Sequence, residues 1–225
     1  MTAVAVIVAA GRGERLGHDR PKALVPLAGR PLLEHAVDAL RAVAEVVEII
    51  VALPAENLDA APPGVRAVAG GAVRSQSVAS GLAAARSEAQ HVIVHDAARP
   101  LATPDLFRRA LEELAATGAD AVIAAAPVTD TIKQAAGDGH TVALTLERDR
   151  LWSVQTPQVF RRPALERALA SGEAELARAT DDAWLIERQG GTVRLLRSSP
   201  RNLKVTTPLD LQVAELLLAQ GVSAR

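Results

Sequence analysis

A glycine-rich loop and three nearby cationic side chains follow the first apolar segment of the chain. The loop spans residues 9–17, with the sequence AAGRGERLG, and Lys22 comes seven residues after Arg15. Backbone N–H groups in a turn of this kind can bind phosphate. A triphosphate that loses pyrophosphate also needs cations where negative charge grows, and Arg15 and Lys22 suit that task. Arg12 fits a solvated surface position at least equally well.

The loop departs from two common phosphate-binding motifs. A dinucleotide fingerprint GxGxxG that starts at Gly11 needs glycine where Leu16 stands, and an acidic residue at the end of the second strand, where Leu53 and Pro54 stand. A Walker loop needs Gly-Lys-Ser/Thr, which is also absent. The missing glycine and the missing acidic residue count against a Rossmann-type NAD(P)-binding oxidoreductase. This function stays open as an alternative to a transferase that uses a triphosphate.

The composition excludes several kinds of partner. The 25 Lys and Arg residues against 26 Asp and Glu give a net charge of −1, so we expect neither a nucleic acid nor an anionic membrane as partner. Aromatic residues make up 2% of the chain, too few for a base-stacking surface. Cysteine is absent, and the five histidines lack the spacing of a metal site. No apolar run approaches the roughly 18 residues that span a bilayer, so we expect a cytoplasmic protein.

Short aliphatic runs alternate with helical stretches, which predicts a Rossmann-like α/β fold with a doubly wound, mostly parallel sheet. We treat residues 1–225 as one domain. The expected strands are Ala3–Ala9, Val47–Leu53, Val65–Ala69, His91–His95, Ala119–Ala126 and Thr192–Leu196, with a returning segment at Gln155–Phe160. The expected helices are Pro31–Val43, Ser75–Arg86, Pro104–Thr117, Pro163–Ala170, one capped at Thr180, and a final helix with Thr207 as N-cap and Pro208 at its first position.

The alternation breaks at about residues 128–153, where two extended segments predict a protruding β-arm. Thr131–Gln134 and Thr141–Leu146 flank the loop Ala136–His140. A lone hairpin cannot bury both of its faces, so we expect the arm to lean on a partner subunit in a homodimer.

A set of motifs along the chain resembles the sugar-phosphate nucleotidyltransferases, and among them the 2-C-methyl-D-erythritol 4-phosphate cytidylyltransferase family. The loop at residues 9–17 with Pro21-Lys22 carries the general resemblance. The narrower one rests on Arg74-x-x-Ser77-Val78, His95-Asp96-Ala97-Ala98-Arg99-Pro100, Asp130-Thr131-Ile132-Lys133, Thr156-Pro157-Gln158, Thr180-Asp181-Asp182-Ala183 and Asn202-Leu203-Lys204-Val205-Thr206. Together these motifs run from residue 3 to about residue 210.

The resemblance implies a nucleotide side and an acceptor side of one site. Arg15 and Lys22 would stabilise the pentacovalent α-phosphate of CTP. The residues implied to bind the nucleotide are Ala9, Ala10, Gly11, Gly13, Gly70, Ser77 and Asp96, with Gly70 and Ser77 helping to choose cytosine. Those implied to receive the sugar-alcohol phosphate are Asp96, Ala97, Arg99, Thr131, Arg148, Thr180 and Lys204.

Two of these positions leave alternatives open. Asp96 ends a predicted strand, where a carboxylate can face ribose or a Mg²⁺–phosphate cluster, but it could instead cap a helix. Arg148 lies two positions before Arg150, and a surface position fits either. Arg201, just before Asn202, adds a cation that we do not expect near Lys204.

The implied reaction needs no covalent nucleophile and no general base. The phosphate oxygen of the acceptor is already anionic at neutral pH and can attack the α-phosphorus of CTP directly, with Mg²⁺ bridging phosphates. A related transferase that uses ribitol 5-phosphate is the nearest alternative. A nucleotide-binding module without catalysis is another alternative. Such a module seldom needs cations both near the departing pyrophosphate and near the attacking phosphate.

Overall fold

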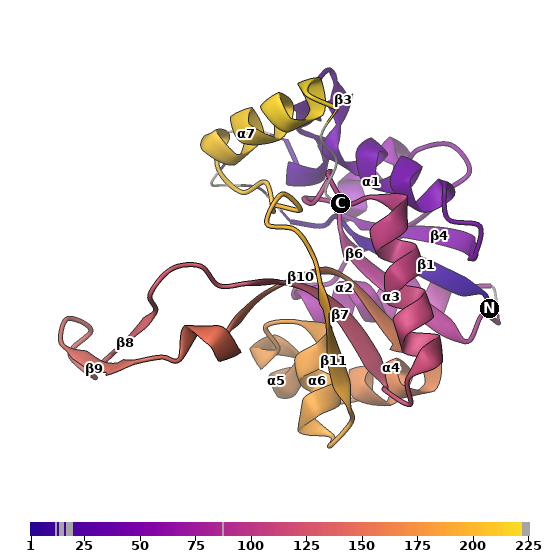
Figure 1. The fold of residues 1–225 in the computed structure, drawn as a ribbon. Helices are drawn as coiled ribbons and strands as arrows, with labels where there is room; N and C mark the ends of the chain where they lie inside the picture. The colour runs from indigo at the N-terminus through magenta and orange to yellow at the C-terminus, as the bar shows by residue number, and fades with distance from the viewer. Residues whose placement is uncertain (12, 14–15, 17–19, 87, 222–225) are drawn as a thin grey trace.

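A mixed sheet in the strand order β11-β7-β10-β6-β1-β4-β5 forms the centre of the molecule (Figure 1). The computed structural model describes the chain except residues 12, 14–15, 17–19, 87 and 222–225. The strands are β1 (Ala3–Val8), β4 (Val46–Leu53), β5 (Arg66–Ala69), β6 (His91–Asp96), β7 (Ala121–Pro127), β10 (Trp152–Arg161) and β11 (Val193–Arg197).

All pairings in this sheet are parallel except those of β10, which runs antiparallel to both β6 and β7. The predicted α/β fold with a mostly parallel sheet is therefore confirmed. Strand β1 is aliphatic along its whole length, as expected for a central parallel strand that is covered on both faces.

Helices cover the two faces of the sheet. On one face α1 (Leu32–Arg41) and α3 (Pro104–Ala116) bury Leu33, Val37, Phe107 and Leu111 against alternate residues of β1 and β6. The other face is covered by α2 (Arg74–Ala84), α4 (Arg162–Leu169), α5 (Glu173–Arg178) and α6 (Asp182–Arg188). Between these layers the core is almost entirely aliphatic, as the composition predicts.

The parallel strands place their carboxyl ends along one edge of the sheet. Val8 at the end of β1 lies opposite Asp96 at the end of β6, and Leu53 at the end of β4 lies opposite Ala69 at the end of β5. Short helical turns follow two of these ends: η2 (Lys22–Leu24) follows the loop after β1, and η3 (Ala55–Ala60) follows β4. Segments far apart in the sequence therefore meet at this edge.

Helix ends show why one predicted cap was wrong. Helix α6 begins after Asp181, whose carboxylate accepts a hydrogen bond from the backbone N–H of Trp184 at 2.8 Å, so Asp181 and not Thr180 is the N-cap. The final helix α7 (Pro208–Ala219) has the predicted cap, because Thr207 accepts from the backbone N–H of Asp210. The carboxylate of Asp210 in turn accepts from the N–H of Thr207 at 2.7 Å.

Two small hairpins lie outside the main sheet. One, made of β2 (Pro26–Leu27) and β3 (Arg30–Pro31), packs near α7, and the other forms the tip of the arm. In the arm β8 (Lys133–Ala135) pairs with β9 (Val142–Thr145), and the ribbon shows it projecting well away from the sheet (Figure 1). Val142 and Leu144 are 57% and 53% exposed, so this single chain leaves these two apolar side chains of the arm uncovered.

Candidate functional site

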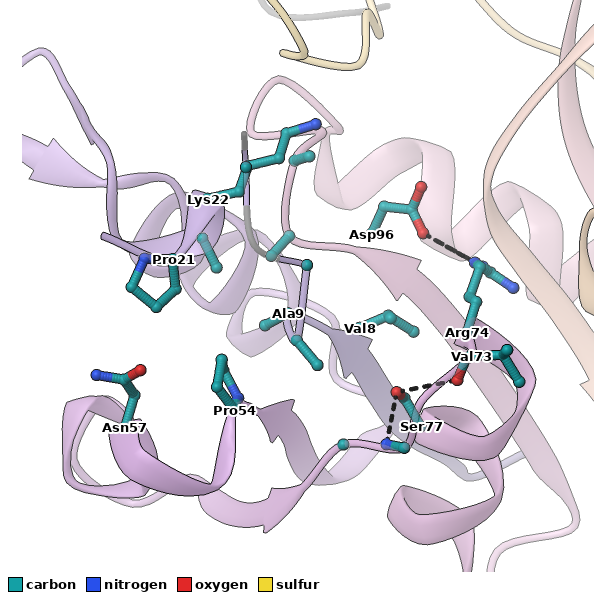
Figure 2. A pocket seen from close by; sticks show the side chains of 18 of the residues that line it. Val8, Ala9, Pro21, Lys22, Pro54, Asn57, Val73, Arg74, Ser77 and Asp96 are labelled. Carbon is teal, nitrogen blue, oxygen red and sulfur yellow. Dashed lines mark hydrogen bonds and ion pairs between the residues drawn. The ribbon is translucent and has the colours of Figure 1, made fainter. Parts of the chain in front are cut away.

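An open cleft of about 1400 Å³ lies at the carboxyl edge of the sheet (Figure 2). Its walls come from the ends of β1, β4, β5 and β6, from the start of α2, and from the segment before α7. The sequence-predicted residues that line it are Ala9, Ala10, Gly11, Gly13, Lys22, Gly70, Ser77, Asp96, Ala97 and Lys204. Arg12 and Arg15 lie outside the described residues.

Gly13 permits a close approach between the loop after β1 and the start of η2. Its φ is +73°, and a Cβ at this position would lie 2.9 Å from Cβ of Lys22. The backbone N–H of Lys22 donates to the carbonyl of Gly11 at 3.2 Å. Glycine at position 13 therefore allows Lys22 to be held against the loop and to line the cleft.

A second glycine loop closes the opposite wall. A Cβ on Gly70 would lie 2.4 Å from Cβ of Ala10 and 3.0 Å from Oγ of Ser77, so only glycine fits there. Ser77 Oγ accepts from the N–H of Gly71 at 3.0 Å and donates to the carbonyl of Val73 at 3.4 Å (Figure 2). Ser77 thus fixes the turn between β5 and α2, and much of this wall is backbone.

Lysines enter the cleft from two different segments. Lys22 comes from η2 and donates to Oγ1 of Thr206 at 3.4 Å. Lys204, on the segment before α7, forms an ion pair with Oδ2 of Asp96 at 2.7 Å. Burial would raise the pKa of Asp96, but Arg74 and Lys204 outweigh it and hold that pKa well below its usual range. Asp96 is therefore ionised at neutral pH.

Arg74 is the main cleft residue to which the sequence analysis gave no role. Its guanidinium forms ion pairs with Asp96, at 3.2 Å, and with Asp182 at the start of α6. The motif that contains Arg74 is visible in the sequence, but its partner Asp182 lies 108 positions later. Other lining residues without a predicted role include Arg20, Asn57 and Thr206.

A buried histidine stands directly behind Asp96. The carbonyl of Arg99 can only accept a hydrogen bond, so Nε2 of His95 donates to it at 3.2 Å. In the neutral ring Nδ1 then accepts from the Thr156 hydroxyl at 3.0 Å, and that hydroxyl accepts from the N–H of Asp96 at 3.0 Å. Burial lowers the pKa of His95 to about 4. The ring is therefore neutral at pH 7 and ties the end of β6 to β10.

Replacing His95 with glutamine should remove part of the acid sensitivity of the fold. The unfolded chain binds a proton at His95 near pH 6.5, whereas the folded chain binds it only near pH 4. The unfolded state therefore holds more protons between these values, and His95 should lower the free energy of unfolding by roughly 3 kcal/mol as the pH falls from about 7 to about 4. Urea unfolding of both proteins across this range measures the difference. An identical pH dependence in His95→Gln would contradict the prediction.

Four predicted acceptor residues are not among those that line the cleft. The Arg99 guanidinium donates to the carbonyls of Asn202 at 2.6 Å and Val154 at 3.4 Å, and so it anchors the segment that carries Lys204. Thr180 is exposed before α6. Thr131 and Arg148 line a separate hollow of about 440 Å³ on the arm. Arg148 also donates to the carbonyl of Thr129 at 3.0 Å.

The described residues contain no cluster of three or more His, Cys, Asp or Glu side chains that could hold a metal ion. Mg²⁺ is commonly bound through one or two carboxylates together with substrate phosphates. The Asp96 carboxylate is ionised and lines the cleft, but its Oδ1 pairs with Arg74 and its Oδ2 with Lys204, so it fits that pattern only when Lys204 releases Oδ2. Within the part of the chain that the structure describes, no helix has the length and apolar character to cross a membrane.

The α/β fold and a cleft lined by lysines from two segments are the features that a nucleotidyltransferase requires. Residues 3–220 match the family model described as IspD, 2-C-methyl-D-erythritol 4-phosphate cytidylyltransferase. Proteins of that name from Nocardia farcinica (strain IFM 10152) and Prochlorococcus marinus (strain MIT 9313) are 48% and 46% identical to this chain. The alignments cover 96% and 95% of it and 93% and 97% of the relatives. The chain belongs to the 2-C-methyl-D-erythritol 4-phosphate cytidylyltransferase family, as the motifs predict.

Solved structures agree with this assignment. The crystal structure of 4-diphosphocytidyl-2C-methyl-D-erythritol synthase from Anaerococcus prevotii DSM 20548 matches with a TM-score of 0.83 and 29% identity, covering 97% of this chain and 98% of its own. The 2-C-methyl-D-erythritol 4-phosphate cytidylyltransferase from Thermus thermophilus matches with a TM-score of 0.78 and 34% identity, over 95% of this chain and 98% of its own.

Proposed function

We propose that this protein transfers CMP from CTP to 2-C-methyl-D-erythritol 4-phosphate, giving 4-diphosphocytidyl-2-C-methyl-D-erythritol and pyrophosphate. Membership in the family supports the reaction. The observation that carries the proposal in this chain is the cleft itself, where Lys22 and Lys204 approach from two segments of the same polypeptide. Cations at two places suit a reaction that brings two polyanions together.

The nucleotide binds along the loops after β1 and β5. Ala9, Ala10, Gly11 and Gly13 present backbone to the triphosphate, and Gly70 with the turn held by Ser77 forms the wall that selects cytosine. Lys22, together with Arg15, stabilises the charge that develops at the α-phosphate and on the departing pyrophosphate.

The acceptor binds at the other end of the cleft, near Asp96, Ala97 and Lys204. Lys204 holds the sugar-alcohol phosphate, and Arg99 supports it by anchoring the backbone of the same segment. Thr131 and Arg148 lie on the arm, which projects away from the sheet (Figure 1), and in a homodimer they reach the cleft of the second subunit. Thr180 is the last of the residues that we assign to the acceptor side.

The acceptor phosphate oxygen attacks the α-phosphorus of CTP, and the bond from that phosphorus to the bridging oxygen of pyrophosphate breaks. The attacking oxygen is already anionic, so the chain supplies no general base. Its residues orient the two substrates in line and offset the repulsion between them. A divalent cation such as Mg²⁺, held by the phosphates and by Asp96, would supply further neutralisation of charge.

Pyrophosphate release should be seen with CTP, Mg²⁺ and 2-C-methyl-D-erythritol 4-phosphate together, and not when ATP or GTP replaces CTP. A coupled pyrophosphate assay with each nucleotide and each acceptor measures this. Equal turnover with ribitol 5-phosphate would move the assignment to the related ribitol-phosphate transferase. Reduction or oxidation of hydroxy acids with NAD(P)(H), with no pyrophosphate release, would instead support an oxidoreductase.

A further inference from the structure

The Arg74 guanidinium lies between two carboxylates that belong to different elements. Nε and Nη2 both approach Oδ1 of Asp96, at 3.3 and 3.2 Å, while Nη1 binds Oδ2 of Asp182. Arg74 begins α2, Asp96 ends β6 and Asp182 begins α6. The close view shows Arg74 reaching from the wall of the cleft to Asp96 (Figure 2).

A carboxylate at position 182 costs folding free energy, because it is removed from water. Its side chain is 0% exposed, and among the described residues its Oδ1 has no hydrogen-bond partner. Burial raises the pKa of Asp182, against the pull of Arg74. Buried ion pairs of this kind are often no more stabilising than apolar residues of similar volume. Stability alone therefore gives no reason for a carboxylate here.

The geometry of the guanidinium gives a reason. An arginine facing a single carboxylate commonly forms two parallel hydrogen bonds and so takes both oxygens. Here Asp182 holds Nη1, and both Nε and Nη2 donate to Oδ1 of Asp96. Oδ2 of Asp96 is left to Lys204, which lies 2.7 Å away at the cleft.

We propose that Asp182 is a positioning residue of the transfer reaction: by holding Arg74 it keeps one oxygen of Asp96 for Lys204 and the substrates. The inference rests on the proposed function, because Asp96 and Lys204 are residues of its acceptor side. Without the negative charge at position 182, the guanidinium can turn and take both oxygens of Asp96. Lys204 then loses the partner that orients it.

Asp182→Asn keeps the shape of the side chain and removes its charge. We expect kcat for CTP and 2-C-methyl-D-erythritol 4-phosphate to fall about ten-fold or more, as is typical when a supporting partner of a site residue is lost. KM for CTP should change less than about three-fold, because the cytosine wall is made by other residues. The matched control is Glu48→Gln, which breaks the part-buried Arg66–Glu48 pair away from the cleft. That control should keep the kcat of the unaltered protein.

A purely structural role of Asp182 predicts different results. Displacement of the start of α2 would move Ser77 and raise KM for CTP while kcat stays. In an Asp96→Asn background, Asp182→Asn should change the residual kcat by less than about two-fold, because its effect passes through Asp96. An unchanged kcat in Asp182→Asn, a rise in KM alone, or the same fold-loss in both backgrounds would each overturn the proposal.

Asp182→Asn removes one of the two negative charges that Arg74 pairs with and can destabilise the fold, so thermal unfolding of the variant is measured first. If it does not fold, Arg74→Met with Asp182→Leu replaces the pair with apolar side chains, a change that buried pairs often tolerate. A folded double variant has no guanidinium that could take Oδ2 of Asp96, so a kcat close to that of the unaltered protein supports the proposed role, and a kcat lowered about ten-fold or more overturns it. An assay of the unaltered protein distinguishes failure of the proposed function from failure of the role of Asp182. No pyrophosphate release from the unaltered protein refutes the proposed function. Normal release from the unaltered protein and from Asp182→Asn refutes only the role of Asp182.

Discussion

Replacing Lys22 with alanine should lower kcat by about two orders of magnitude or more, the scale seen when one preorganised charge-stabilising group is removed. Lys22 lines the cleft at the start of η2, beside the glycine loop that would hold the triphosphate. In the proposed reaction its ammonium group would stabilise the charge that grows as pyrophosphate departs. The family resemblance of the loop predicts the same loss for Arg15→Ala. Steady-state pyrophosphate release with both substrates varied measures kcat and KM.

Thermal stability should change little in Lys22→Ala. The backbone N–H that donates to Gly11 is retained, and the losses of the side chain include a hydrogen bond of 3.4 Å to Thr206 and the attraction to the Asp210 carboxylate. A hydrogen bond of this kind contributes about 1 kcal/mol, and an ion pair open to solvent contributes about 1 kcal/mol or less. The matched control is Arg108→Ala, which removes an exposed cation on α3 outside the cleft and should keep kcat. If Lys22→Ala raised KM for CTP and left kcat near normal, Lys22 would bind the ground state and not the transition state.

The sequence was sufficient to predict the framework of the site, because that framework depends on local patterns. Aliphatic runs alternating with helices predict parallel strands, and parallel strands place their carboxyl ends at one edge. The glycine loop after β1 and Asp96 at the end of β6 are therefore expected near each other, and Asp96 and the described loop residues 9–11 and Gly13 all line the cleft. The family resemblance predicts Gly70 and Ser77 as site residues, and their packing explains the residue types.

The direction in which a long side chain points was not predictable in the same way. Arg99 follows Asp96 by three positions and carries a charge suited to a phosphate, yet its guanidinium turns to the carbonyls of Asn202 and Val154. Arg74 and Asp182 meet only because α2 and α6 cover the same face of the sheet. No periodicity relates two residues so far apart, so sequence patterns alone could not identify the pair. The Thr180 cap failed for a smaller reason, since Asp181 offers a better acceptor one residue later.

Mixing two inactive variants should restore activity if the arm completes the site of a partner subunit. Within one chain, Arg148 lies with Thr131 on the arm, and neither lines the cleft that contains Lys22. The arm projects away from the sheet, and its apolar residues Val142 and Leu144 are uncovered (Figure 1). If Arg148 contacts the acceptor, it must therefore do so in another copy of the chain.

The symmetry of a two-fold dimer sets the size of the effect. Lys22→Ala and Arg148→Ala homodimers should both be nearly inactive, because every site lacks one residue. In a mixed dimer one site carries both defects and the other carries neither. Random exchange makes about half of the dimers mixed, so about a quarter of the activity of the unaltered protein should return.

A second mixture supplies the control that the cleft itself offers. Lys22 and Lys204 line the same cleft of one chain. Mixed dimers of Lys22→Ala and Lys204→Ala therefore contain one defect in each site, and no activity should return. Subunit exchange is verified by native mass spectrometry on both mixtures. If exchange occurs and the Lys22→Ala and Arg148→Ala mixture stays inactive, Arg148 does not act at the cleft of the partner. The arm would then have only a structural part in the dimer, because two defects on different chains would otherwise leave one site intact.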